Sequence, residues 1–152
     1  MFWIWPTVAI VLSVAAVSLT LVSLYVEDWS RDFAQNSAST SDDPKAALPA
    51  HRSDLPPAEL ANHVIAAAGQ LPGWHLAKLD EGRGTITLRF VRSTRLLRFK
   101  DDIVVHITPE ADGTLLRAES KSRLGKGDLG QNPRNLRELL TAIKQQQPAL
   151  AR

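Results

Sequence analysis

Residues 2–26 form an uninterrupted stretch without a single Asp, Glu, Lys, Arg, His, Asn or Gln. The hydrocarbon core of a bilayer is about 30 Å thick, and a helix of about 20 apolar residues crosses it. The stretch is long enough to do so with some tilt. Trp3, Trp5, Tyr25 and Trp29 flank it, as aromatic residues do at the two membrane interfaces. The sequence therefore predicts one N-terminal transmembrane helix, within an anchor of residues 1–29.

Two other interpretations of this stretch are less consistent with its composition. A buried core helix rarely continues this far without a polar residue. A cleaved signal peptide has a basic start, an apolar run of about 7–15 residues and a small-residue cleavage site. Here the basic start is missing, and the stretch ends in "LYVEDW", which is a poor cleavage sequence. An uncleaved, single-pass anchor is the favoured interpretation.

The side of the membrane is weakly specified by charge. No Lys or Arg precedes the stretch, and Arg31 and Lys45 are the first cations after it. Counting Lys and Arg alone places the following domain in the cytoplasm. The acids that offset the charge of these cations are Glu27, Asp28, Asp32, Asp42 and Asp43.

The rest of the chain suits one domain joined to the anchor by a linker. The protein has 152 residues, a net charge of +2 and no cysteine. The charge is too small to indicate a nucleic-acid partner, and the absence of cysteine excludes disulfides, thiolate metal sites and a cysteine nucleophile. Residues 30–56 are rich in Ser, Ala, Asp and Pro and have no sustained period, which predicts a flexible linker.

Hydrophobic periodicity predicts an α+β domain over residues 57–148. Helical spacing appears at 57–71 and 132–147, where Leu136, Leu139, Leu140 and Ile143 form one apolar stripe. Strand-like segments lie between these helices, at 74–79, 85–93, 101–109 and 114–122, and "EADG" forms a hairpin turn between the last two. The expected fold is an antiparallel four-stranded meander flanked by two helices, in the order α-β-β-β-β-α.

The segment "SRLGKGDLGQNPRN", residues 122–135, is the first candidate for chemistry. Asn132 and Pro133 form a helix-start pair, and the helix N-terminus with nearby cations favours an anion or a phosphate-bearing headgroup. Asp128 in its middle would repel an anion. The alternative is a structural loop, in which glycines supply the backbone angles and Asp128 bonds loop amides or an arginine. The cations are Arg123, Lys126 and Arg134, and the glycines are Gly125, Gly127 and Gly130.

A basic run precedes a pair of acids in residues 82–102. Six cations and no acid occur before Asp101 and Asp102. Such a face attracts phospholipid headgroups, whereas cross-strand ion pairs with the acids are the ordinary alternative. Aromatic residues are almost absent from this run, which disfavours binding of single-stranded nucleic acid.

The sequence assigns no catalytic residue, metal site or cofactor. Asp102 and His106, on one strand, would stand about 13 Å apart, too far to share a metal. Ser120 and Ser122 have no evident base partner, and motifs of the H-E-x-x-H and G-x-S-x-G types are absent. The four histidines are His51, His63, His75 and His106.

Two segments read together resemble the domain of unknown function 1499 family. They are "FVRSTRLLRFKDDIVVHI" and "RAESKSRLGKGDLGQNPRNLRELL". The family pattern has an aromatic–Arg–aliphatic–Phe segment leading to an Asp pair, then R-S-x-S-R-x-G-x-x-D-L-G-x-N before the last helix. The Asp pair falls on Asp101 and Asp102. The second motif falls on Ser120, Ser122, Arg123, Gly125, Asp128, Leu129, Gly130 and Asn132.

The resemblance covers residues 55–143 and has two departures. Many members carry a cysteine-containing segment before the first helix, where this chain has "HRSDLPP", and Glu119 occupies the position usually read as Arg. The resemblance implies an α+β domain associated with the membrane or envelope, without a known reaction. It favours a periplasmic domain on the bacterial inner membrane, against the charge count.

These observations predict a membrane-anchored, non-catalytic envelope domain that binds a partner protein or an anionic ligand such as a lipid headgroup, and no nucleic acid. The alternative is a hydrolase that uses clustered Asp and Arg residues. We expect Arg95 or Arg98, Asp101 or Asp102, Arg123 and Asp128 to lie close together. The candidate site residues are Arg95, Arg98, Asp101, Asp102, Arg123, Gly125, Lys126, Asp128, Gly130 and Asn132.

Overall fold

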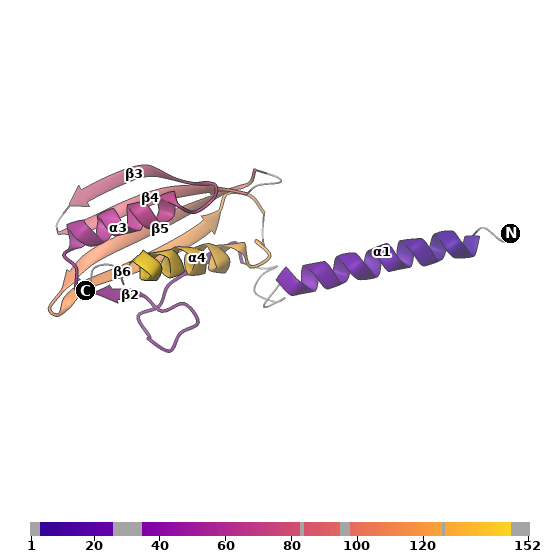
Figure 1. Ribbon diagram of the computed structural model, residues 1–152, viewed down its shortest axis with the longest axis horizontal. Helices are drawn as coiled ribbons and strands as arrows, with labels where there is room; N and C mark the ends of the chain where they lie inside the picture. Colours follow the sequence, from indigo (N-terminus) through magenta and orange to yellow (C-terminus); the bar gives the residue numbers. More distant parts are fainter. Residues whose placement is uncertain (1–3, 26–34, 83, 95–97, 126, 147–152) are drawn as a thin grey trace.

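The computed structural model describes residues 4–25, 35–82, 84–94, 98–125 and 127–146 (Figure 1). Three helices and six strands lie in these ranges. The helices are α1 (Ile4–Tyr25), α3 (Pro57–Gly69) and α4 (Gln131–Gln146). The strands are β1 (Ser37–Ser39), β2 (His51–Ser53), β3 (Trp74–Gly82), β4 (Thr85–Ser93), β5 (Lys100–Glu110) and β6 (Gly113–Ser122).

The strands form one antiparallel sheet in the order β1-β6-β5-β4-β3, and β2 also pairs with β6. The α+β class and the antiparallel meander of β3 to β6 are therefore confirmed. The expected count of four strands is wrong, because β1 and β2 add to the outer side of β6. Both extra strands have only three residues, too few to show the alternating pattern from which a strand is predicted.

Helices α3 and α4 cover one face of the sheet (Figure 1). The apolar stripe of α4 packs there, with Leu136, Leu139 and Ile143 completely buried. The alternate residues of the central strands meet this stripe from the sheet side, and they share one hydrophobic core. They are Ile86, Leu88, Phe90, Ile103, Val105, Ile107, Leu116 and Ala118.

Residues 35–56, which were expected to belong to a flexible linker, are part of this fold. Ala38 pairs with Ser120, and Arg52 pairs with Leu115. Thr114 Oγ1 also donates a hydrogen bond of 2.7 Å to the carbonyl of Leu55. The folded domain begins before Pro57 because β6 offers an otherwise open edge, whose backbone groups need partners. Residues 30–34 lie outside the described ranges.

The N-terminal helix is present as α1, and its described side chains are exposed and mostly apolar. Within the part of the chain that the structure describes, no helix has the length and hydropathy needed to cross a membrane, and the expected transmembrane helix is not found.

Candidate functional site

Asp128 caps the N-terminus of α4. Its Oδ1 accepts a 2.9 Å hydrogen bond from the backbone N–H of Gly130, and its Oδ2 accepts one of 2.8 Å from Asn132. These amides belong to the helix start, where N–H groups have no partner inside the helix. Leu129 and Gly130 both have positive φ, of 52° and 74°, and bring the chain around the carboxylate. The carboxylate also complements the helix dipole.

Asn132 has a different role from the N-cap expected from the sequence. Its side chain is completely buried, and its Oδ1 accepts a 2.6 Å hydrogen bond from Ser120 Oγ. Its Nδ2 donates to the carbonyl of Asn36 at 2.7 Å and to Ser122 Oγ at 3.1 Å. Asn132 therefore connects α4 to the last residues of β6 and to the segment that leads into β1.

Asp101 and Asn135 form the second half of this buried polar network. Asp101 is 2% exposed, and its two oxygens accept hydrogen bonds from Ser122 Oγ at 2.7 Å and from Asn135 Nδ2 at 2.9 Å. Asn135 Oδ1 accepts from Gln131 and from Arg92 on β4. The carboxylate of Asp101 is thus held by neutral donors rather than by an arginine directly.

Asp102 lies on the opposite face of β5. Its ion pair is exposed and is formed with Arg123, which lies outside the basic run that precedes Asp101. Arg123 donates to its two oxygens through Nε at 2.8 Å and Nη2 at 2.6 Å. This bidentate hydrogen bond lowers the pKa of Asp102 and raises the pKa of Arg123. Neither change suits a general acid or base near neutral pH.

The predicted cluster is therefore only partly assembled. Asp102 and Arg123 meet, whereas Asp128 uses both oxygens on backbone amides. Arg98 is exposed, and its backbone N–H bonds the carbonyl of Thr94. Gly125, with a φ of 93°, accepts a hydrogen bond from Asn36 Nδ2 through its carbonyl. Arg95 and Lys126 lie outside the described residues.

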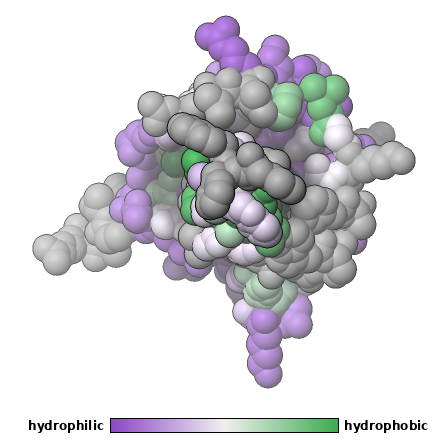
Figure 2. Space-filling model, turned by 90° about the vertical axis from the view of Figure 1, so that its right-hand side faces the viewer, coloured by the Kyte–Doolittle hydropathy of each residue, from purple (hydrophilic) through white to green (hydrophobic). Residues whose placement is uncertain are grey.

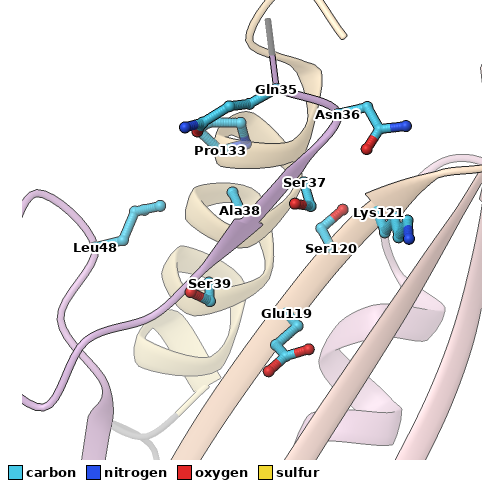
Figure 3. A pocket seen from close by; sticks show the side chains of 10 residues that line it. All are labelled: Gln35, Asn36, Ser37, Ala38, Ser39, Leu48, Glu119, Ser120, Lys121 and Pro133. Carbon is cyan, nitrogen blue, oxygen red and sulfur yellow. The ribbon is translucent and has the colours of Figure 1, made fainter. Parts of the chain in front are cut away.

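An open groove with a volume of about 870 Å³ lies beside β1, next to the polar network (Figure 3). Figure 3 shows its side chains along β1 and along the facing part of β6, with α4 behind them. Amide and hydroxyl groups predominate, with one acid and one base. The lining residues are Gln35, Asn36, Ser37, Ala38, Ser39, Leu48, Glu119, Ser120, Lys121 and Pro133.

One edge of β1 points away from the sheet. The carbonyl of Asn36 accepts from the N–H of Ser122, and the N–H of Thr40 donates to the carbonyl of Ala118. Backbone groups of an antiparallel strand alternate in direction, so those of Asn36, Ala38 and Thr40 face β6. Those of Ser37 and Ser39 consequently face outward.

Several residues of the site were not identified as candidates from the sequence. Asn36, Arg92 and Asn135 complete the network, and Ser37 and Ser39 line the groove. Asn135 carried one usable signal, because an amide follows Asn132 by three residues on the buried side of an apolar helix. Within the described residues, no three His, Cys, Asp or Glu side chains are grouped in a way that would hold a metal.

The fold and the site define an α+β domain in which a six-stranded antiparallel sheet carries two helices, and a buried polar network fixes the second helix. The chain matches the family model described as "Protein of unknown function (DUF1499)" over residues 27–143 and belongs to this family. The family resemblance seen in the sequence is thereby confirmed. No curated protein matches the chain.

Proposed function

We propose that the protein is a non-catalytic binding domain, associated through α1 with the bacterial inner membrane and exposed to the periplasm. An extended segment of a partner protein binds along β1. The observation that carries this proposal is the outward edge of β1 beside an open groove. Peptides commonly bind by adding a strand to such an edge, where main-chain hydrogen bonds provide affinity.

The non-catalytic part of the proposal is supported by the state of the candidate carboxylates. Asp101 is buried among neutral donors, Asp102 is paired with Arg123, and Asp128 caps a helix. None of the three lines the groove. The hydrolase alternative needs at least one carboxylate placed to exchange a proton with a substrate, and these three are all engaged in holding the fold.

The choice of a polypeptide over an anionic ligand is supported by the charge of the groove. Glu119 and Lys121 are its charged residues and are of opposite sign. Their charges offset one another, whereas a phosphate or headgroup site gathers cations. The neutral amide and hydroxyl groups suit the backbone and polar side chains of an extended peptide.

Membrane association is supported by α1, whose exposed side chains include Trp5, Ile10 and Leu12, at 75%, 64% and 63% exposure. Apolar surface on this scale is favourable in a bilayer and costly in water. The periplasmic side is supported by the family resemblance. A reporter that is active only in the periplasm, fused after Arg152, should be active, and activity of a cytoplasmic reporter alone would contradict this assignment.

Site-specific photo-crosslinking in cells tests the binding site. A photoreactive amino acid at Ser39 lies in the proposed groove, and the same amino acid at Asp112, in the exposed turn between β5 and β6, serves as the control. We expect one discrete adduct from position 39 and none from position 112. Identical adducts from both positions, or none from position 39, would contradict the proposal.

A proline variant tests whether the outward backbone N–H groups of β1 bind the partner segment. Ser39→Pro removes an outward N–H and leaves the ladder to β6 intact, since proline is tolerated at the open side of an edge strand. The adduct from a photoreactive group at Ser37 should be lost in this variant. Ser39→Ala, which keeps the N–H, should retain it. Retention in both variants would exclude strand addition.

A further inference from the structure

We propose that one end of the folded domain rests on an anionic membrane surface, with residues 98–100, 123–125 and 127–129 in contact with the lipid. The inference rests on the membrane association proposed above. It adds an orientation of the domain and a second lipid contact, distinct from α1.

Exposed apolar side chains gather at this end of the sheet. Among the described residues outside α1, five large hydrophobic ones are exposed, and three of them are Phe99 at 46%, Leu124 at 66% and Leu129 at 42%. The N–H of Arg123 donates to the carbonyl of Lys100 at 3.0 Å, so the loop ends that carry Phe99 and Leu124 are adjacent. The other two are Leu76 and Leu79 on edge strand β3.

Cations accompany these apolar side chains. Arg98 and Lys100 are exposed, and Arg134 donates a hydrogen bond to the carbonyl of Leu129. The acids at this end are already engaged, Asp102 by Arg123 and Asp128 by the start of α4. Apolar side chains flanked by Arg and Lys are typical of surfaces that enter the headgroup region of a membrane.

The opposite end of the sheet carries exposed acids. It contains the turns that join β3 to β4 and β5 to β6, where Asp80, Glu81, Glu110 and Asp112 lie close in sequence to the turns. Arg52 lies 3.6 Å from Glu110, and Asp80 lies 2.6 Å from Lys78 and 3.9 Å from Arg89. Glu81 and Asp112 are exposed. The exposed acids at this end and the exposed Arg98 and Lys100 at the other favour the end with Phe99 and Leu124 as the one that faces an anionic surface.

The chain enters the domain at the same end. Asn36 bonds Gly125, Ser122 and Asn132, and α1 ends at Tyr25. The residues between Tyr25 and Asn36 span at most about 40 Å even when fully extended. Figure 2 looks toward this side of the molecule, and hydrophobic and hydrophilic surfaces lie next to each other in this view. A membrane that holds α1 is thus within reach of these loops.

Depth measurements on the full chain test the inference, and the lack of native cysteine makes single labels simple. Leu124→Cys and, as the control, Asp112→Cys are labelled with an environment-sensitive fluorophore. The protein is added to phosphatidylcholine vesicles with and without phosphatidylglycerol, some carrying headgroup-depth quenchers. We expect a blue shift and quenching at position 124, stronger on the anionic vesicles, and neither change at position 112.

Charge reversal provides the second arm. Arg98→Glu with Lys100→Glu should weaken the quenching at position 124 on anionic vesicles on the order of tenfold. Lys45→Glu with Lys144→Glu, an equal charge change elsewhere, should have little effect. A chain that floats with the vesicles while the label at position 124 stays in water would overturn this inference and leave the membrane association intact. A chain that does not float would overturn both.

Discussion

Asp128 shows how a charged residue of the family signature acts through the backbone. The sequence allowed an anion site, an ion pair with an arginine, or bonds to loop amides at this position. The structure has the last of these, because the carboxylate accepts the N–H groups of Gly130 and Asn132. Loss of an N-cap side chain usually costs about 1 kcal/mol, within a range of about 0.5–2 kcal/mol.

Asp128→Ala should therefore lower the free energy of unfolding by about 1–2 kcal/mol. Asp128→Asn keeps one acceptor for these amides and should lower the free energy of unfolding by a smaller amount. Urea denaturation of the three proteins measures the difference. If Asp128→Ala unfolds at the same urea concentration as the parent protein, the capping role is incorrect.

Substitution of Asn135 should lower the free energy of unfolding more than substitution of Asp128. Asn135→Ala leaves the buried carboxylate of Asp101 and the guanidinium of Arg92 without an amide partner. The loss of a partner to a buried charge costs on the order of 3 kcal/mol. Gln145→Ala removes an amide from an exposed position of the same helix and provides the control. Equal melting temperatures for the two variants would contradict a structural role of the network.

Individual contacts were only partly predictable from the sequence. The approach of Arg123 to Asp102 was predictable, because the strand with Asp102 returns through a hairpin as the strand that ends at Arg123. The run of cations before Asp102 did not identify this partner. The N-cap assignment of Asn132 failed because two side chains competed for the helix start, and sequence alone cannot tell which carboxylate or amide reaches it. The loop conformation at Leu129 and Gly130 decides the competition in favour of Asp128.

The elements with a clear hydrophobic period were predicted well, and the short ones were not. The strands β4, β5 and β6 match their alternating patterns, as the helix α4 matches its stripe. In contrast, β1 and β2 exist through pairing with β6 and not through a pattern of their own. Their Ser- and Pro-rich context favours loops locally, and the tertiary contacts override it.

His51 on β2 should make the stability of the fold depend on pH in mildly acidic solution. Burial lowers its pKa below the usual 6.5, and the charge of Lys144 adds to this change. The unfolded chain then binds more protons, so the stability contributed by neutral His51 is present above pH 6.5 and is lost as the pH falls through the lowered pKa.

The free energy of unfolding should thus decrease between about pH 7 and pH 5, where Asp42 and Asp102 remain ionised because their pKa values are also lowered. His51→Gln should flatten this decrease, whereas His75→Gln, at an exposed position, should not. Chemical denaturation of the parent protein and the two variants at several pH values measures the free energy of unfolding. An equally steep decrease in all three proteins would assign the effect to another group.

In the whole fold, side chains of the signature motif form a hydrogen-bonded network that connects segments far apart in sequence. The core of α3, α4 and the sheet was predictable because each element carries its own apolar face. The network was not predictable, because Asn36, Ser120 and Asn132 lie together only through the pairing of β1 with β6. This arrangement fixes the edge of β1 on which the proposed binding depends.

Hydrogen exchange of Asn132→Ala tests whether the signature motif couples α4 to β1. We expect the amides of residues 36–40, 120–122 and 131–135 to lose protection together, because Asn132 bonds the first two segments and lies in the third. The turn at 110–113 should keep its exchange rates, as should every segment in the control Asn62→Ala, at an exposed position of α3. Loss of protection confined to residues 131–135, with 36–40 unchanged, would contradict the claim that the signature couples α4 to the binding edge.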